Sequence, residues 1–370
     1  MISIVKTKSS KDVKKAIELL GGMENFVKKG EHVLVKPNIC IGKRSETGAV
    51  TDAEMVAEVC EMVHSCGADV VVGESPIYPW NGKKVFEEAG YGDFEEKYGF
   101  KMINLDDDEK VTIKIPNGVA IKQNVVAKTV LKSDKIINMP VLKTHLQTTL
   151  TLSLKNIKGI VPGRYKHYIH VKGLDDGIVD LNTVIRSDLQ IVDGIIGMHG
   201  KRGPTGGKAV EIGVIVAGDN RVEVDSICAR IVGIDPMKVA HIRKAYERGL
   251  GDIDVKDVRG SSIDDVRVNI EVPLSPTLMR FLISNILLRT IHTIADPVLS
   301  LLGRNKLKIG AIVKEIKIDN RKCRRCMACV KGCPVNALAF EGGELKWDRE
   351  RCIFCYCCVE ICKYGAIDVQ

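Results

Sequence analysis

The chain has 370 residues, of which 45% are hydrophobic and 5% aromatic, and its formal net charge is +8. This length suits one or two domains with a small module besides. No uninterrupted apolar run reaches the roughly 18 residues that span a bilayer, and the few aromatic side chains offer little for nucleic acid bases to stack on. We therefore do not expect nucleic acid as a partner, and the basic balance favours an anionic substrate or an anionic membrane surface.

The first 272 residues are expected to form an α/β domain. Met1 leads directly into a strand-like run, so no targeting segment is expected. Ser10 is expected to begin a helix that extends to Leu20, and Thr51 or Asp52 to cap the next one. Further strands are expected at 31–35, 69–73, 135–139, 189–192 and 212–217, and further helices at 53–65, 222–232 and 237–248. Apolar strands separated by helices predict a mostly parallel sheet that is covered by helices on both faces.

Polar residues follow five of these strands. They are Lys36-Pro37-Asn38, Glu74, the segment Asn138 to His145, Asp193, and Gly218-Asp219-Asn220. The carboxyl ends of parallel strands share one edge of a sheet, and ligands bind there. We therefore expect all five loops to line one crevice.

Lysines dominate the expected crevice, and asparagines accompany them as neutral hydrogen-bonding partners. A glycine-rich loop at 200–208 would let backbone N–H groups approach a phosphate or carboxylate. Ala209 stands where a P-loop would carry Ser or Thr, so a magnesium-nucleotide site is not expected. The alternative is that each lysine is merely solvated at a strand end. The expected substrate-binding residues are Lys36, Asn38, Glu74, Lys155, Asn156, Asp193, Gly203, Gly206 and Gly207.

The expected catalytic residues are Lys143, His145 and His170. A histidine in a strand-end loop can donate a proton near neutral pH. His167 lies close to His170 in the chain and is a further candidate. Glu74, Asp193 and Asp219 are the carboxylates that could orient a histidine.

The same residues carry a resemblance to a known family. The motifs are V-K-P-N at 35–38, G-E-S at 73–75, N-M-P-V-L-K-T-H at 138–145, L-K-N-I-K-G at 154–159, V-D-G-I at 192–195, G-P-T-G-G at 203–207 and A-G-D-N-R-V-E-V-D at 217–225. Over roughly residues 1–250 this succession resembles the domain-of-unknown-function 362 family, several members of which carry a C-terminal ferredoxin module. The resemblance supports the fold boundary and the site residues more than any one reaction.

Residues 273–312 are expected to form an apolar helical linker. Arg280, Arg289 and Pro297 argue against a membrane-spanning helix. The wide apolar face predicts burial against the α/β domain, against a second copy of the chain, or in peripheral contact with a membrane through 276–302.

Residues 313–370 are expected to form a ferredoxin-type domain, because two runs of cysteines repeat the spacing C-x2-C-x2-C-x3-C. The runs are Cys323, Cys326, Cys329 and Cys333, then Cys352, Cys355, Cys358 and Cys362. This spacing is typical of [4Fe–4S] clusters, with the fourth cysteine of each run ligating the other cluster. Structural zinc usually takes two cysteine pairs, and disulfides suit small secreted domains, so both alternatives fit poorly. The segment resembles bacterial-type two-cluster ferredoxins, and two [4Fe–4S] clusters are the expected cofactors.

The two runs differ at the residue that follows each fourth cysteine, which is Pro334 in the first and Lys363 in the second. Lys363 keeps a backbone N–H and adds a cation, and both would favour the reduced cluster that Cys362 ligates. Cys357 is left over by the spacing and is expected to be a packed thiol.

Together these features predict an iron–sulfur electron-transfer protein, a ferredoxin-coupled reductase that acts on an anionic small molecule at the carboxyl edge of the sheet. The alternatives are a non-catalytic electron-transfer or docking partner of another oxidoreductase, or a metal-cofactor assembly factor that uses Cys40. The expected partner is an electron donor or acceptor protein, and a homo-oligomer stays open. Cluster ligands and scattered single cysteines indicate the reducing cytoplasm of an anaerobe.

Overall fold

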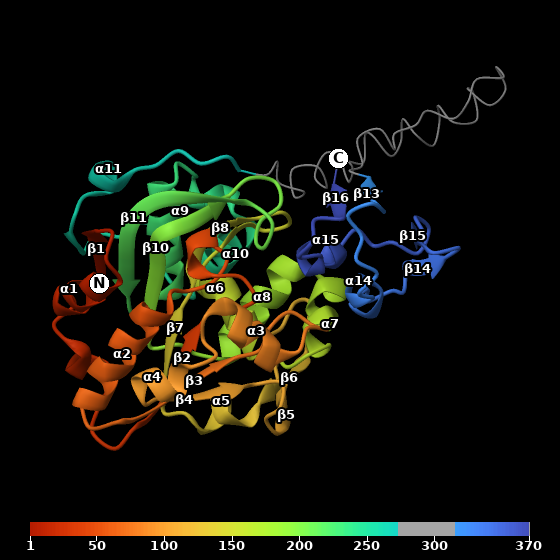
Figure 1. The fold of residues 1–370 in the computed structure, drawn as a ribbon. Helices are drawn as coiled ribbons and strands as arrows, with labels where there is room; N and C mark the ends of the chain where they lie inside the picture. The colour runs from red at the N-terminus through yellow and green to blue at the C-terminus, as the bar shows by residue number, and fades with distance from the viewer. Residues whose placement is uncertain (273–314, 370) are drawn as a thin grey trace.

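The computed structural model describes residues 1–272 and 315–369. In the described part of the chain, the larger domain is built on a ten-stranded sheet (Figure 1) with the main order β12-β1-β11-β10-β7-β2-β3-β4, and β8 and β9 extend it beside β10. Its strands are β1 (Ile2–Lys6), β2 (His32–Pro37), β3 (Asp69–Glu74), β4 (Lys101–Asn104), β7 (Lys135–Met139), β8 (Val141–His145), β9 (Thr149–Thr151), β10 (Leu189–His199), β11 (Lys208–Gly218) and β12 (Val258–Gly260). The predicted α/β fold class is confirmed.

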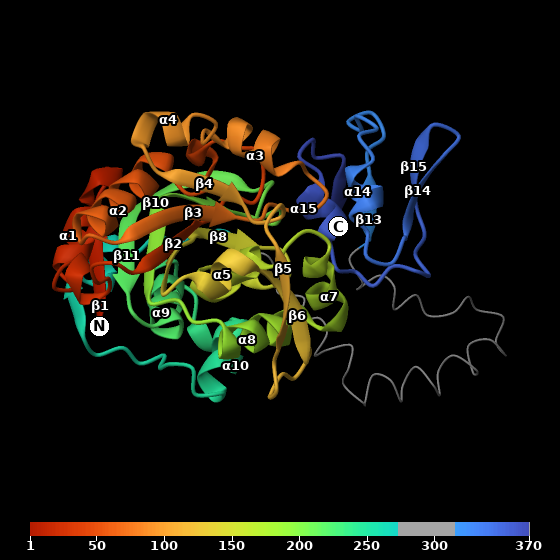
Figure 2. The ribbon, with the colours of Figure 1, turned by 90° about the horizontal axis from the view of Figure 1, so that it is seen from below.

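Helices cover both faces of this sheet (Figures 1 and 2). They are α1 (Val13–Glu18), α2 (Ala53–Ser65), α3 (Gly82–Ala89), α4 (Phe94–Tyr98), α5 (Lys128–Lys132), α6 (Ser153–Asn156), α7 (Tyr165–Lys172), α8 (Leu174–Val184), α9 (Arg221–Ile231), α10 (Ala240–Glu247) and α11 (Ile263–Val266). Side chains alternate between the faces of a strand. In β2, Val33 and Val35 pack in the core with α1 to α4, whereas Leu34 packs in the core with α8 to α10. Because both faces are buried, the middle of the strand, Val33 to Val35, is apolar without alternation.

The strands β10 and β11 form a long antiparallel hairpin, which the sequence did not predict. Gln190 pairs with Gly218, and Met198 pairs with Ala209. The loop that joins them is too short for the helical crossover that a parallel pair requires. The prediction that the residues after 217 reach the common crevice is therefore wrong: Asp219 lies at the opposite edge, where its carboxylate is 3.3 Å from the amino group of Met1.

Several predicted elements agree with the structure. Helix α2 and strand β7 have the expected bounds, and Asp52 caps α2 by accepting hydrogen bonds from the backbone N–H groups of Glu54 and Met55. The first helix is shorter than predicted, because residues 10–12 form a 3-10 turn and α1 begins only at Val13. The small sheet of β5 (Lys110–Lys114) and β6 (Gln123–Ala127) was not predicted.

The C-terminal module repeats a small unit. Strand β13 (Ile316–Ile318) pairs with β16 (Ile367–Val369), and β14 (Leu338–Glu341) pairs with β15 (Glu344–Trp347). Helix α14 (Ala328–Lys331) lies within the first cysteine run and contains Cys329, and α15 (Cys357–Ile361) lies within the second and contains Cys358. Both ribbon views place α15 beside the α/β domain and the β14–β15 hairpin farthest from it (Figures 1 and 2).

Direct contacts hold α15 and its flank against the α/β domain. The Trp80 indole N–H donates to the carbonyl of Ile361 at 3.1 Å, and the Thr205 hydroxyl donates to the carbonyl of Glu360 at 2.8 Å. The predicted linker at 273–312 lies outside the described residues. Among the residues that are described, no helix is long and apolar enough to cross a membrane.

Candidate functional site

Two cavities in the C-terminal module are lined by cysteines from both runs. The first, with roughly 330 Å³ of empty space, is lined by Cys323, Cys326, Cys329 and Cys362. The second, with roughly 300 Å³, is lined by Cys333, Cys352, Cys355 and Cys358, and also by Cys357. In each cavity three cysteines of one run thus meet the fourth cysteine of the other, as the spacing predicted.

The two cysteine loops have the same backbone conformation at matching positions. Arg325 and Phe354 both have φ 52°, and Met327 and Tyr356 have φ 63° and 54°. Side chains other than glycine rarely adopt this left-handed region. The backbone N–H of Ala337 donates to Cys333 Sγ at 3.2 Å, and that of Ala366 donates to Cys362 Sγ at 3.3 Å. Four convergent thiols and N–H groups directed at sulfur are the donor set that a [4Fe–4S] cluster requires, so the residues fit this cofactor.

Lys363 contacts the α/β domain rather than a cysteine-lined cavity. Its ammonium group lies 3.0 Å from both carboxylate oxygens of Glu88 and 4.8 Å from the centre of the Trp80 ring. Because Glu88 largely balances the charge of Lys363, the predicted electrostatic effect on the cluster is reduced. The difference between the two runs at this position marks the interdomain contact.

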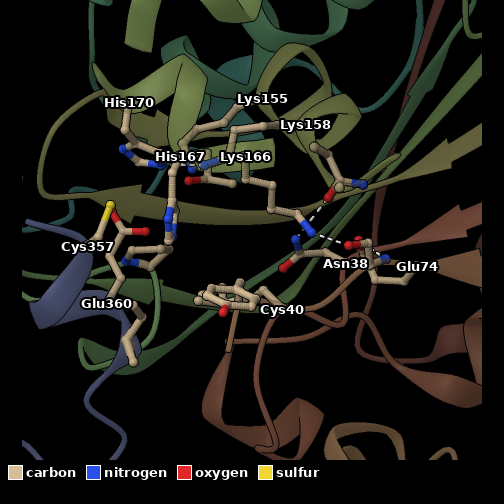
Figure 3. A pocket seen from close by; sticks show the side chains of 18 of the residues that line it. Asn38, Cys40, Glu74, Lys155, Lys158, Lys166, His167, His170, Cys357 and Glu360 are labelled. Atoms are coloured by element: carbon tan, nitrogen blue, oxygen red, sulfur yellow. Dashed lines mark hydrogen bonds between the residues drawn. The ribbon is translucent and has the colours of Figure 1, made fainter. Parts of the chain in front are cut away.

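A pocket with roughly 680 Å³ of empty space lies where the carboxyl ends of β2 and β3 face α15 (Figure 3). It is lined by Asn38, Cys40, Glu74, Ser75, Ile77, Tyr78, Lys143, Thr151, Lys155, Asn156, Lys158, Gly159, Lys166, His167, His170, Pro204, Cys357, Glu360 and Ile361. Four lysines and two glutamates are among these residues. The last three belong to the C-terminal module, so the pocket lies between the two domains.

A buried ion pair forms one end of the pocket. The Lys36 ammonium group donates to Glu74 Oε2 at 2.8 Å, and both side chains are almost completely buried. Burial lowers the pKa of Lys36 and raises that of Glu74, and the attraction between the two opposes both shifts. A Cβ atom at Gly159 would lie 2.2 Å from Glu74 Oε1, which explains the glycine in L-K-N-I-K-G.

Three asparagines hold the floor of the pocket in a chain of hydrogen bonds. Asn38 donates to Asn156 at 2.9 Å, and Asn156 donates to Asn138 at 2.8 Å. The Lys143 ammonium group donates to Asn38 Oδ1 and to the carbonyl of Ala49, both at 2.5 Å. Lys143 is fully buried and already has these partners. Its side chain therefore orients Asn38 as well as adding positive charge.

Lys155 differs from the other pocket lysines because its ammonium group has no hydrogen bond or ion pair within the described residues, although the residue is only 7% exposed. Burial and the neighbouring Lys158 lower the pKa of Lys155 to about 7. Lys155 is thus a buried cation donor that is available to a bound anion.

Lys158 and His170 form a close pair, with Lys158 Nζ 2.5 Å from His170 Nε2. Burial and the charge of Lys158 lower the pKa of His170, so the ring is neutral and accepts this hydrogen bond. His170 Nδ1 is buried without a protein partner in the described part of the chain. The pair therefore presents an ammonium proton next to an imidazole.

Lys166 comes from α7 and contacts the residues that follow β3. Its ammonium group hydrogen-bonds to the Ser75 hydroxyl and lies 3.0 Å from the carbonyl of Pro76. Burial lowers the pKa of Lys166 to about 8, although Asp106 and Glu74 oppose the shift.

His145 and Glu360 meet across the domain boundary, with His145 Nε2 3.1 Å from Glu360 Oε1. The geometry is that of an electrostatic contact, since neither atom has a well-directed hydrogen bond. His145 Nδ1 accepts hydrogen bonds from the backbone N–H groups of Gln147 and Thr148, so the ring proton lies on Nε2. Burial raises the pKa of Glu360, but His145 and Lys155 outweigh it and hold that pKa well below its usual range.

The structure brings together seven of the residues that were predicted for the site. Asn38, Glu74, Lys143, Lys155, Asn156 and His170 line the pocket, and Lys36 supports it from behind. His145 contacts Glu360 but does not line the pocket. Their roles in substrate binding or catalysis stay predictions.

The remaining predicted residues lie elsewhere. Asp193 accepts hydrogen bonds from the backbone N–H groups of Asp52 and Ile195, and so supports the start of α2. Gly203, Gly206 and Gly207 do not line the pocket. A Cβ atom at Gly203 would lie 2.2 Å from the carbonyl of Thr144, so close packing explains this glycine better than anion binding does.

Sequence reasoning missed Lys166, Cys357, Glu360 and Ile361 as pocket residues. The last three are remote in the chain from the others, and no local pattern indicated that α15 closes the crevice. Lys166 lies on α7 together with His167 and His170. Its closeness in the chain to these two candidates could have indicated that it also lines the pocket.

Comparisons with known proteins match two separate parts of the chain. Residues 33–230 match the family model described as domain of unknown function (DUF362), and residues 315–363 match that of the 4Fe-4S dicluster domain. The first match covers more than half of the chain, so the chain belongs to the DUF362 family. The dicluster domain supports iron–sulfur electron transfer, as predicted from the cysteine runs.

A thylakoid-associated protein of Synechocystis, sll1697, is 30% identical over 240 residues, which are 63% of this chain and 73% of that protein. Among solved structures, the lactate racemase apoprotein of Thermoanaerobacterium thermosaccharolyticum superposes with a TM-score of 0.43 at 11% identity. That superposition covers 63% of this chain and 57% of the racemase, so the chain spans less than two thirds of the racemase's length.

Proposed function

We propose that this protein is an iron–sulfur reductase that passes electrons from its C-terminal module to an anionic small molecule in the interdomain pocket. One observation carries the proposal: Cys357 lines both this pocket and the cavity formed by Cys333, Cys352, Cys355 and Cys358. The second cysteine-lined cavity and the pocket thus lie on either side of one residue, Cys357. An electron at that cavity would have a short path to the pocket.

The charges of the pocket favour an anion. Lys143, Lys155, Lys158 and Lys166 line it, against Glu74 and Glu360. Glu74 is already paired with Lys36, which does not itself line the pocket. Among the described residues, Lys155, the unpartnered Nδ1 of His170 and the unpartnered hydroxyl of Thr151 are donors that a ligand can use. A carboxylate or phosphate group suits them, because a desolvated anion needs both charge and hydrogen bonds.

Two [4Fe–4S] clusters, held by the two sets of four cysteines, would supply electrons one at a time. A two-electron reduction that adds two hydrogen atoms to the substrate also takes up two protons, and the second of these would come from solvent. The Lys158–His170 pair is placed to provide a proton, since the ammonium group of Lys158 already directs one toward the imidazole. Lys155 would hold the anionic group while this occurs.

His145 has a different role from the one that its position in the sequence suggested. Its proton faces Glu360, and its other nitrogen is occupied by backbone donors. Burial lowers the pKa of His145 to about 4, so the ring stays neutral at physiological pH. We infer that it positions Glu360 and helps to close the pocket.

The test is anaerobic purification, analysis of iron and sulfide, and mass spectrometry of any small molecule released on denaturation. We expect about eight irons and eight sulfides per chain, as two cubane clusters require, together with an anionic ligand. Substrate turnover is then measured with chemically reduced protein. The Lys155→Met variant should lose turnover while it keeps iron and sulfide, and Lys14→Met, an exposed lysine on α1, is the matched control.

Two results would count against the reductase. Ligand binding without turnover by reduced protein would favour a non-catalytic electron-transfer partner. Binding of a metal ion between Cys40 and Cys357, both of which line the pocket, would favour a cofactor assembly role. The cytoplasm is the location that we propose for either activity.

A further inference from the structure

The two cysteine-lined cavities differ in their exposure. At the first cavity Cys326 is exposed, and the lining residues Met327 and Tyr364 are 37% and 41% exposed. At the second, Cys355, Cys357 and Cys358 are all buried. The first cavity also shares no lining residue with the interdomain pocket, whereas the second shares Cys357. The first is therefore the cavity that another protein can approach, and the second is the one next to the pocket.

The charge around the two cysteine runs differs as well. From residue 320 to 340 the chain has five cations and no Asp or Glu, whereas the segment 348–363 has three of each sign. The five cations are all exposed, and we call them the basic face: Arg321, Lys322, Arg324, Arg325 and Lys331. Arg324 itself lines the first cavity.

Most of this positive charge is not neutralised locally. The carboxylate oxygens of Asp319 lie 3.3 Å from Arg321 Nε and 3.9 Å from Lys322 Nζ. One negative charge is thus shared between two positive charges. Arg324, Arg325 and Lys331 form no ion pair within the described residues. On the neighbouring hairpin, Glu344 is paired with Lys346 at 2.8 Å, and Glu341 is exposed. The basic face therefore keeps a net positive charge beside an exposed apolar pair, Met327 and Tyr364.

We propose that the basic face is the electron-entry surface of the protein, and that it binds an acidic one-electron carrier protein. Electrons enter at the first cysteine-lined site, move to the second and reach the interdomain pocket. The inference rests on the proposed function for the last of these steps only. Exposed apolar residues with a charged rim are the usual anatomy of a transient interface, and charge complementarity raises the association rate.

This step is a one-electron transfer in which no bond is formed or broken and no proton moves. Cys323, Cys326, Cys329 and Cys362 would hold the cluster that accepts the one electron lost by the reduced carrier. A second carrier molecule supplies the second electron that the proposed reduction needs. The carrier's own cofactor, an iron–sulfur cluster or a flavin, is the source of both.

The experiment measures the rate at which a photoreduced acidic ferredoxin reduces the oxidised, cluster-loaded protein in an anaerobic stopped-flow instrument. The second-order rate constant should fall steeply as salt is raised, because ions screen the attraction. The variant Lys322→Glu/Arg325→Glu should be about 10- to 100-fold slower at low salt, which is within the range of electrostatic steering. The amount of cluster that excess dithionite reduces at completion should be unchanged in that variant, which shows that its clusters are intact.

A matched control carries the same change of charge elsewhere on the module. Lys317 and Arg349 are both exposed and lie outside the basic face, so Lys317→Glu/Arg349→Glu should react at nearly the rate of the unmodified protein. Because Arg325 has a left-handed backbone conformation, Lys322→Glu/Lys331→Glu serves as a second test variant.

A rate that is independent of salt, or one that the control pair lowers as much as the test pairs do, would overturn the proposal. Tight binding to vesicles of anionic phospholipid that both test variants abolish, with carrier reduction unaffected, would assign the face to a membrane surface and overturn it too. Failure of the proposed reductase is distinguishable, because cluster reduction is observed directly and needs no substrate.

Discussion

Glu360 of the C-terminal module lies 3.1 Å from His145 of the α/β domain, and both side chains are buried. The contact closes the pocket that the carboxyl edge of the sheet opens. Since His145 accepts two backbone hydrogen bonds at Nδ1, its orientation is set within its own domain, and Glu360 is positioned against it. The pocket wall is therefore complete only when the two domains are together.

Anion affinity should depend on pH through Lys155. The ammonium form binds anions, and its pKa is lowered to about 7. Sulfate, whose charge is constant above pH 5, should therefore bind well at pH 6 and up to tenfold more weakly for each pH unit above 7. Isothermal titration at pH 6, 7 and 8 checks this. Lys155→Met should weaken binding and flatten the profile at neutral pH.

Lys166 provides a control on that profile, because its pKa is lowered only to about 8. Lys166→Met should leave the decrease near pH 7 in place and remove only the part at higher pH. An unchanged pH profile in Lys155→Met would assign the titration to another group.

The buried pair Lys36–Glu74 should behave as a unit. Lys36→Met leaves Glu74 buried without its cation, which should cost about 3–5 kcal/mol of unfolding free energy. Lys36→Met/Glu74→Gln removes both charges and should recover part of that loss. Urea unfolding under anaerobic conditions measures both. Equal stability of the single and double variants would contradict the coupling.

Asp193 should make stability fall as pH rises. Burial raises the pKa of its carboxyl to about 7, although the backbone N–H of Asp52 opposes the shift. The unfolded carboxyl has an ordinary pKa of about 3.9, so the unfolded state is ionised at pH 5.5 to 7 while the folded state holds a proton. The stabilising contribution is thus present at low pH and is lost as pH rises through about 7.

Asp193→Asn should remove this dependence, and the difference between variant and unmodified protein should change by on the order of 2 kcal/mol between pH 5.5 and 7. Chemical unfolding at several pH values gives the two slopes. Parallel slopes would show that the Asp193 carboxyl is ionised throughout.

The crossed ligation of the two clusters predicts different outcomes for neighbouring cysteines. Cys362→Ala removes a cysteine of the first cavity, so it should lower iron content by up to about half and alter the spectrum of that cluster. Cys357→Ala, five residues before it, should keep both clusters. Iron analysis and electron paramagnetic resonance of the reduced proteins distinguish the cases. Loss of a cluster in Cys357→Ala would make Cys357 a ligand.

Much of the fold followed from local patterns. Apolar strands such as β7 and the capped helix α2 were predicted with their bounds, because hydrophobic periodicity and an N-cap aspartate are local signals. The direction of β11 was not predicted, because the residues of an apolar run do not indicate whether the strand pairs in a parallel or an antiparallel arrangement. The pairing of Gln190 with Gly218 and of Met198 with Ala209 shows that β11 runs antiparallel to β10.

By itself, the sequence determined the chemistry of the cysteine runs and the kind of residue at each strand end. Ligand spacing is a property of a short segment, so it can be recognised without the fold. Tertiary structure alone decided that Asp219, Gly203, Gly206 and Gly207 do not line the pocket, and that Lys166, Cys357 and Glu360 do. These placements depend on strand direction and on the packing of α15 against the α/β domain, both of which arise from contacts between residues far apart in the chain.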